Sequence, residues 1–171
     1  MPLPSIDPAN YPSQLAEKVS QFKLAFAPFA IPEPEVFPSA PEHYRLRAEF
    51  RIWHQDERLD YAMFDPENPK QPVMVEHFPM AAESICALMP RLLERLRVSQ
   101  TLRGGLFQAD FLATLSGELM VTLIYHRQLG TGWELAARDL AVDLTVQVIG
   151  RSRGQKVVLD RDWLLEEFEL N

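Results

Sequence analysis

The sequence predicts a single domain of the α+β class, with a largely antiparallel sheet and helices packed on one of its faces. Residues 43–54 alternate between apolar and polar side chains, which is the period of a half-buried strand. Further short strands are separated by turn residues, whereas two other stretches have helical periodicity. At 171 residues the chain is long enough to bury a core. The sheet face without helices is then free to meet a partner.

The first 42 residues are predicted to form a helix followed by an extended connector. Apolar residues recur on one helical face between Tyr11 and about Phe26, namely Leu15, Val19, Phe22 and Phe26. Residues 27–42 contain five prolines, too many for a regular element. The apolar residues of this connector indicate that it is anchored over the protein surface and is not a flexible linker; they are Phe29, Ile31, Val36 and Phe37.

The strand predicted at residues 43–54 has two chemically opposite faces. One face is apolar, with Tyr44, Leu46, Ala48, Phe50 and Ile52, and the other carries Arg45, Arg47, Glu49, Arg51 and Trp53. Side chains on one face lie roughly 6.6 to 6.8 Å apart. Guanidinium groups at this spacing, next to an indole, suit phosphates and an unstacked base. The alternative is an ordinary half-buried strand with a solvated charged face.

Three further elements are predicted between residues 59 and 97. Strands at 59–64 and 72–77, joined by a turn at 65–69, would extend the arginine strand into a meander. Residues 79–97 have helical periodicity, with Pro90 inside the segment. A proline at this position should kink the helix or split it in two.

The last third of the chain is predicted to complete the sheet. Residues 106–115 and 118–127 form a hairpin around Ser116 and Gly117. A short helix at 133–143 follows, and strands at 145–150 and 156–159 close the sheet. Residues 160–171 form an acidic tail. The domain therefore divides into residues 1–42, the sheet and helices of 43–159, and this tail.

The charge distribution limits the kind of nucleic-acid binding that this chain can support. The formal net charge is −7, which repels a polyanion. Residues 1–42 carry −3 and residues 160–171 carry −4, so residues 43–159 are neutral. Binding to RNA would therefore depend on local arginine clusters, and we expect it to be weak.

Composition also bears on metals, membranes and compartment. The one cysteine, Cys86, excludes an internal disulfide and suits a reducing cytoplasm. The four histidines have no ligand spacing, so we expect no metal site. No run of about 20 apolar residues predicts a membrane helix, and the first residues do not have the pattern of a secretory signal.

Several segments in order along the chain resemble one enzyme family. They include Tyr11-Pro-Ser-Gln-Leu-Ala-Glu-Lys-Val19, Pro34-Glu-Val-Phe37, Leu106-Phe-Gln-Ala-Asp-Phe-Leu-Ala-Thr-Leu-Ser116, Tyr125-His126 and Ile149-Gly-Arg151. Together with the arginine strand, they resemble the bacterial transfer-RNA uracil-5-methyltransferases, which make the ribothymidine of the T-loop. The resemblance implies tRNA modification in the cytoplasm, with the T-arm of tRNA, and possible further RNAs with a tRNA-like T-arm, as partners.

The same resemblance implies that this chain lacks the catalytic part. Family members have a second, Rossmann-like domain that binds S-adenosylmethionine and carries the nucleophilic cysteine and the general base. The chain has no Gly-rich strand-to-helix turn, no Asp-Pro-Pro motif and no Ser-Cys-Asn-Pro segment, and Cys86 lies in an apolar helical stretch. We therefore expect an inactive, cofactor-free, amino-terminal RNA-binding domain, whose tail leads toward a catalytic domain that acts in cis.

The resemblance also assigns roles to particular residues. Arg51 would reach the T-loop near the target nucleotide, although it could instead form an ion pair with Glu49. Phe107 would lie beside the flipped base, although its sequence context alone favours a core position. His126 would hold the T-loop, although an isolated histidine is more often structural.

The remaining candidates have weaker support. Arg45 and Arg47 are possible phosphate contacts, or solvated edge residues. Gln108 and Asp110 are expected to project from the strand face opposite Phe107, and Arg127 from the face opposite His126. Arg151 and Arg153 form a small basic turn, which is more often a solvated loop.

Two other classes of function remain open from the sequence. The first is a free-standing RNA-binding module with no catalytic partner domain. The second is a structural α+β protein without a nucleic-acid role, which the acidic balance favours.

Overall fold

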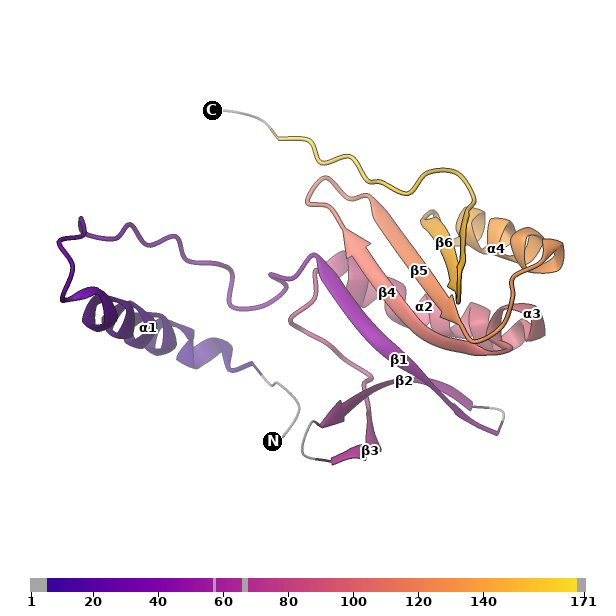
Figure 1. The fold of residues 1–171 in the computed structure, drawn as a ribbon, viewed down its shortest axis with the longest axis horizontal. Coiled ribbons are helices and arrows are strands. Elements are labelled where there is room, and N and C mark those ends of the chain that lie inside the picture. The colour runs from indigo at the N-terminus through magenta and orange to yellow at the C-terminus, as the bar shows by residue number, and fades with distance from the viewer. Residues whose placement is uncertain (1–5, 57, 66–67, 169–171) are drawn as a thin grey trace.

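The computed structural model describes residues 6–56, 58–65 and 68–168 (Figure 1). In these ranges the chain forms a seven-stranded sheet with the order β3-β2-β1-β4-β5-β6-β7. All neighbouring strands are antiparallel except β5 and β6. The strands are β1 (Arg47–Gln55), β2 (Arg58–Asp65), β3 (Asn68–Met74), β4 (Leu106–Ala113), β5 (Leu119–Tyr125), β6 (Gln147–Ser152) and β7 (Gln155–Val158).

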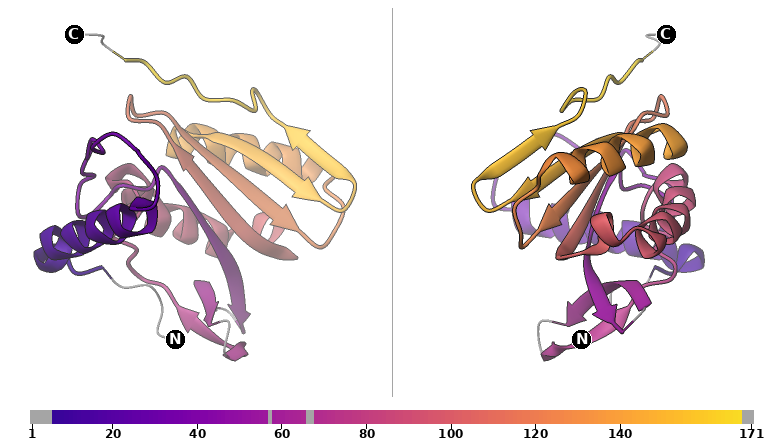
Figure 2. Two further views of the ribbon diagram at one scale, coloured as in Figure 1. Left: turned by 60° about the vertical axis from the view of Figure 1, so that its left-hand side comes forward. Right: turned by 90° about the vertical axis from the view of Figure 1, so that its right-hand side faces the viewer.

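Three helices cover one face of this sheet. They are α2 (Glu83–Val98), the short α3 (Gln100–Arg103) and α4 (Thr131–Leu144), and Figure 2 shows them gathered on the same side. Helix α4 connects the parallel strands β5 and β6, because a parallel pair requires a crossover. The apolar side chains between helices and sheet form one buried core. The predicted α+β class, with helices on one face of a mostly antiparallel sheet, is confirmed.

Aromatic rings hold the centre of the core together. Phe50 on β1 lies edge-on to Phe78 and Phe111, with ring centroids 5.1 and 6.1 Å away. Tyr61 on β2 packs against the same cluster, and its hydroxyl donates to the carbonyl of Met89 in α2. This bond satisfies a polar group that would otherwise be buried at a cost of about 1–3 kcal/mol.

Helix α4 lies unusually close to the sheet at Gly150. Trp133 in α4 is 1% exposed and packs over β6. A Cβ atom added at Gly150 would lie 2.3 Å from the Trp133 ring and 2.6 Å from Leu129. Position 150 therefore has no room for a side chain.

The strand predicted to begin at His43 begins at Arg47 instead. His43 has a left-handed backbone (φ 55°), which interrupts an extended run. Residues 43–45 form a short ladder with residues 79–82, in which the N–H groups of His43 and Arg45 donate to the carbonyls of Pro79 and Met80. This ladder also explains why α2 begins at Glu83, later than the predicted start at 79.

Other boundaries also differ from the prediction. Strand β3 spans Asn68–Met74, whereas a strand at 72–77 was expected. Two residues of the turn expected at 65–69, Pro66 and Glu67, lie outside the described residues. Helix α2 continues past Pro90, so a split at the proline is wrong. Ser99 then ends α2, and its hydroxyl accepts the N–H of Leu102 to cap the unpredicted helix α3.

The amino-terminal arm has the expected elements but not the expected packing. After a short 3-10 turn (Pro8–Asn10), helix α1 spans Tyr11–Phe26 as predicted, yet none of its residues is buried. Figure 1 shows α1 away from the sheet. Its apolar stripe meets the connector, where a cavity is lined by Val19, Phe22, Val36 and Phe37. The four predicted anchors of the connector are all exposed, Phe37 by 83%, so the expectation that they fix it over the protein surface is wrong. The connector instead contacts α1, through the Phe26–Phe29 ring pair and the Lys23–Glu33 ion pair.

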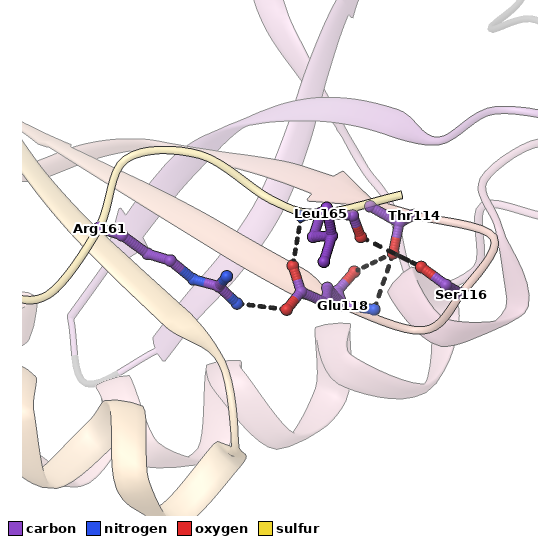
Figure 3. A network of polar contacts seen from close by, with 5 residues as sticks. All are labelled: Thr114, Ser116, Glu118, Arg161 and Leu165. Carbon is purple, nitrogen blue, oxygen red and sulfur yellow. Dashed lines mark hydrogen bonds and ion pairs between the residues drawn. The ribbon is translucent and has the colours of Figure 1, made fainter. Parts of the chain in front are cut away.

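The acidic tail is tied to the β4–β5 hairpin (Figure 3). The carboxylate of Glu118 forms an ion pair with Arg161 and accepts the backbone N–H of Leu165 at 2.6 Å. The carboxylate of Glu166 accepts the N–H groups of Leu115 and Ser116 at 2.7 and 2.8 Å. The tail is thus held against the hairpin as far as Glu166.

We expect this tail to detach from the hairpin at acid pH. The N–H of Leu165 and the guanidinium of Arg161 lower the pKa of Glu118, and Lys156 lowers the pKa of Asp162. Desolvation raises the pKa of Glu166, but the N–H donors of Leu115 and Ser116 outweigh it, so its pKa is also lowered. A lowered pKa means that docking is fully stabilised above the ordinary carboxyl pKa and is lost as pH falls through the lowered value. Amide shifts of Leu115 and Ser116, followed by NMR, should titrate below pH 4.5.

The variant Glu166→Gln provides the control for this titration. Removing its charge weakens the bonds to Leu115 and Ser116. The acid transition of both amides should then shrink, whereas an unchanged transition would mean that Glu166 does not hold the tail.

Candidate nucleic-acid interface

The sheet face opposite the helices carries the predicted arginine row on β1. Burial alternates along this strand, with Ala48, Phe50 and Ile52 buried. Arg47, Glu49 and Arg51 are exposed on the other face. The two-faced character predicted for this segment is therefore confirmed from Arg47 onward, and the helix-free side is called the open face below.

Three predicted site residues form a stack on the open face. The Arg51 guanidinium carbon lies 3.8 Å from the ring centroid of Phe107. The rings of Phe107 and His126 have centroids 4.1 Å apart and are tilted by 52°. The three side chains come from β1, from β4 and from the residue after β5, so the fold unites positions far apart in the sequence. They are called the Arg51–Phe107–His126 stack below.

A β-bulge places Phe107 in this stack. Leu106 pairs with Tyr125 and Gln108 pairs with Ile124, so Phe107 is the additional residue of β4. Gln108 is the register partner of Arg51, and Phe107 contacts Arg51, so both lie on the open face. Asp110 pairs with Glu49 and so lies on the open face as well. The expectation that Gln108 and Asp110 project opposite Phe107 is therefore wrong, because simple alternation does not hold across a bulge.

The polar neighbours of the stack are paired with one another. Gln108 donates to the carboxylate of Asp110 at 2.7 Å. Glu49 forms its ion pair with Arg47, at 2.5 Å, rather than with Arg51. The guanidinium of Arg51 consequently meets the ring of Phe107 and not an acid.

Burial raises the pKa of Asp110. Desolvation is the largest cause, Gln108 opposes it by hydrogen bonding, and the charges of Glu49, Arg47 and Arg151 act with smaller effect. A partly desolvated carboxylate on the face that carries the arginines is a feature that the sequence pattern did not reveal.

Two candidates lie outside the stack. Arg45 is exposed but precedes β1, so it does not share the alternation of the strand. Arg127 donates to the carbonyls of Gly104 and Thr101, each at 2.5 Å, and to that of Gln128 at 3.2 Å. These bonds hold the loop before β4 in place, so the geometry gives Arg127 a structural role.

Strand β6 places Arg151 on the open face. Arg151 pairs with Ile124 of β5 and lies within β6, whereas a basic turn was expected. The parallel pairing of β5 with β6 brings it near Asp110, and sequence periodicity contains no signal for that pairing.

Cys86 has the environment of a structural thiol. Its sulfur lies 3.3 Å from the carbonyl oxygen of Phe78 and 3.9 Å from Nδ1 of His43. Burial raises the pKa of the Cys86 thiol, which lowers the thiolate fraction that a nucleophile needs.

The described residues contain neither a group of metal ligands nor a membrane-spanning helix. Within residues 6–56, 58–65 and 68–168, no three His, Cys, Asp or Glu side chains are grouped so as to hold a metal ion. In the same ranges, no helix has the length and apolar character to cross a bilayer. These ranges contain one mostly antiparallel sheet and no doubly wound parallel sheet.

The fold and the stack define an α+β domain whose open sheet face presents a guanidinium group and an imidazole ring on either side of an aromatic ring. Residues 10–171 match the family model described as tRNA (Uracil-5-)-methyltransferase. The match covers nearly the whole chain, and the chain belongs to this family. The family resemblance found in the sequence is thereby confirmed.

Curated relatives give the same family and a measure of length. The chain is 71% identical over its full length to a tRNA/tmRNA (uracil-C(5))-methyltransferase of Aromatoleum aromaticum, and covers 46% of it. It is 65% identical over its full length to the protein of that name from Dechloromonas aromatica, and covers 47% of it. For the Azotobacter vinelandii protein, 99% of this chain aligns at 50% identity and covers 47% of the relative. The chain therefore spans about half the length of these relatives.

Proposed function

We propose that this chain is the amino-terminal, RNA-binding portion of a tRNA uracil-5-methyltransferase. It grips the T-arm of tRNA, or of another RNA with a tRNA-like T-arm, and positions the T-loop uridine for methylation at C5. The observation that carries the proposal is the Arg51–Phe107–His126 stack on the open face, in a chain of a tRNA-modifying family. By itself, the chain is expected to be inactive.

The stack suits an unstacked base. Single-stranded loops are recognised by stacking bases on aromatic rings or on guanidinium planes. Arg51 and His126 are both exposed, so a base turned out of the T-loop can extend the stack at either end. Base flipping costs a few kcal/mol, which such a platform offsets by holding the loop open.

The methyl transfer itself is assigned to the part of the protein outside this chain. S-adenosylmethionine supplies the methyl group there, and the family mechanism uses a cysteine thiolate that attacks C6 of the uracil ring. The side chains of this chain would bind and orient the RNA. Cys86, with its raised pKa and its carbonyl neighbours, is not suited to be that nucleophile.

The charge distribution predicts weak, local binding. The net charge of −7 opposes long-range attraction, and the open face offers only a few arginines. Affinity should therefore fall with salt, with a shallow slope that reflects few phosphate contacts.

The direct test is titration of a labelled T-arm hairpin against this chain at low and moderate salt. We expect saturable binding that weakens as salt rises. The double variant Arg51→Ala/Phe107→Ala should weaken it by about 5- to 150-fold, because one base stack is worth about 1–3 kcal/mol. The matched control is Arg91→Ala, which removes one positive charge from helix α2 on the covered side.

Binding that survives the double variant, or that the Arg91→Ala control weakens equally, would contradict the assigned interface. If neither this chain nor the full-length protein binds the hairpin at any salt concentration, the proposal is contradicted. That result would favour a structural protein, for which the acidic balance is the supporting observation.

A further inference from the structure

A concavity lies on the open face, separate from the Arg51–Phe107–His126 stack. It has a volume of about 170 Å³. Its polar rim comes from β1, β4, β5 and β6, through Arg47, Asp110, Thr122 and Arg151. Leu112 and Met120 supply apolar lining.

The strand register aligns this concavity with the stack. Arg51 pairs with Gln108, Gln108 with Ile124, and Ile124 with Arg151. These residues therefore form one row across four adjacent strands. Neighbouring strands lie about 4.8 Å apart, so Arg151 is about 14 Å from Arg51 along the row.

The rim has the donors that a phosphate needs. Among the described contacts, no hydrogen bond or ion pair uses the guanidinium of Arg151, which is exposed and offers five N–H donors. Arg47 is paired with Glu49 through one nitrogen, and its side chain is 67% exposed. Thr122 adds a hydroxyl on the strand between them.

We propose that this concavity is a second RNA subsite, in which Arg151, assisted by Arg47 and Thr122, binds a backbone phosphate of the RNA whose base meets the Phe107 stack. This inference rests on the proposed function. It adds the course of the RNA strand, which runs across the sheet from β1 toward β6.

Asp110 limits the affinity of this subsite. Its carboxylate lies between the two arginines and repels a phosphate. Desolvation already raises its pKa, in agreement with a position that disfavours negative charge. Removing this charge while keeping the shape of the side chain should therefore strengthen binding, opposite to the effect of removing Arg151.

The test compares Arg151→Ala, Asp110→Asn and the Arg91→Ala control in salt titrations with the T-arm hairpin. Loss of one phosphate contact should lower the affinity for the Arg151 variant and reduce its salt slope by about 1. Asp110→Asn should raise the affinity. The control should change neither quantity.

A set of hairpins with one backbone phosphate at a time replaced by an uncharged methylphosphonate makes the test specific. At one position, neutralising the phosphate should lower the affinity of the wild-type chain. The same replacement should not lower the affinity of the Arg151→Ala chain any further, because the contact is already absent. If Arg151→Ala behaves like the Arg91→Ala control while Arg51→Ala/Phe107→Ala still weakens binding as expected, the subsite is wrong and the proposed function stands. If the wild-type chain and the full-length protein do not bind the hairpin, the proposed function itself fails.

Discussion

Replacing Phe107 by alanine in the full-length enzyme implied by the proposed function is expected to lower kcat/KM for tRNA methylation by about 5- to 150-fold, equivalent to about 1–3 kcal/mol. The variant removes the ring that lies between Arg51 and His126, and with it the stacking platform. Phe107 is half-buried, and its ring contacts lie on the open face rather than in the core. Methyl incorporation into a tRNA transcript, measured under kcat/KM conditions, reports the loss.

Two substitutions separate stacking from packing at this position. Phe107→Tyr keeps the aromatic plane and should retain most activity. Phe107→Leu keeps apolar bulk without the aromatic plane, so its kcat/KM should be close to that of the alanine variant. Thermal unfolding of all three should match wild type, and near-normal activity of Phe107→Leu would mean that the ring serves packing and not a base.

Local periodicity predicted the β1 part of the open face well. Alternation sufficed to place Arg51 opposite Phe50 because β1 is regular from Arg47 onward and one of its faces is buried. It failed upstream, where the left-handed backbone of His43 ends the regular strand and leaves Arg45 outside it. A single residue with positive φ has no signal in a hydrophobic pattern.

The sheet face on which Phe107 lies could not be predicted from the sequence of β4 alone. Alternation within β4 assigned Phe107 and Gln108 to opposite faces, whereas the bulge opposite Tyr125 and Ile124 places both on one face. The bulge depends on pairing between strands, so a pattern read along one strand does not contain it. The family resemblance nevertheless selected Phe107, Arg51 and His126, which the fold brings together.

Long-range contacts explain the remaining differences. The tail is held because Glu118 and Glu166 accept backbone N–H groups about 50 residues away along the chain, and a charge count gives no indication of this. Similarly, the apolar residues of the Pro-rich connector were expected to anchor it over the protein surface, but Val36 and Phe37 lie beside α1 and are exposed. The apolar pattern of a segment does not indicate which other segment it will contact.

Replacing Gly150 by alanine is expected to destabilise the domain by about 3 kcal/mol, at the upper end of the usual cost of overpacking a core. The added methyl would lie 2.3 Å from Cη2 of Trp133 and 2.6 Å from Cδ1 of Leu129, well inside van der Waals contact. Trp133 is 1% exposed, so in a close-packed core its ring has no solvent-filled space into which to move. Urea denaturation should show a lower midpoint at an unchanged m-value.

Two comparisons make this expectation specific to the contact between α4 and β6. Gly132→Ala in the first turn of α4 meets no atom within 4 Å and should leave stability unchanged or raise it slightly. Adding Trp133→Phe to Gly150→Ala shortens the ring that the methyl would strike, so the double variant should be less destabilised than the sum of the single variants. Two results would contradict this contact: destabilisations of the two single variants that add exactly in the double variant, or a Gly150→Ala variant as stable as Gly132→Ala. Either would mean that Trp133 of α4 lies farther from Gly150 than the structure places it.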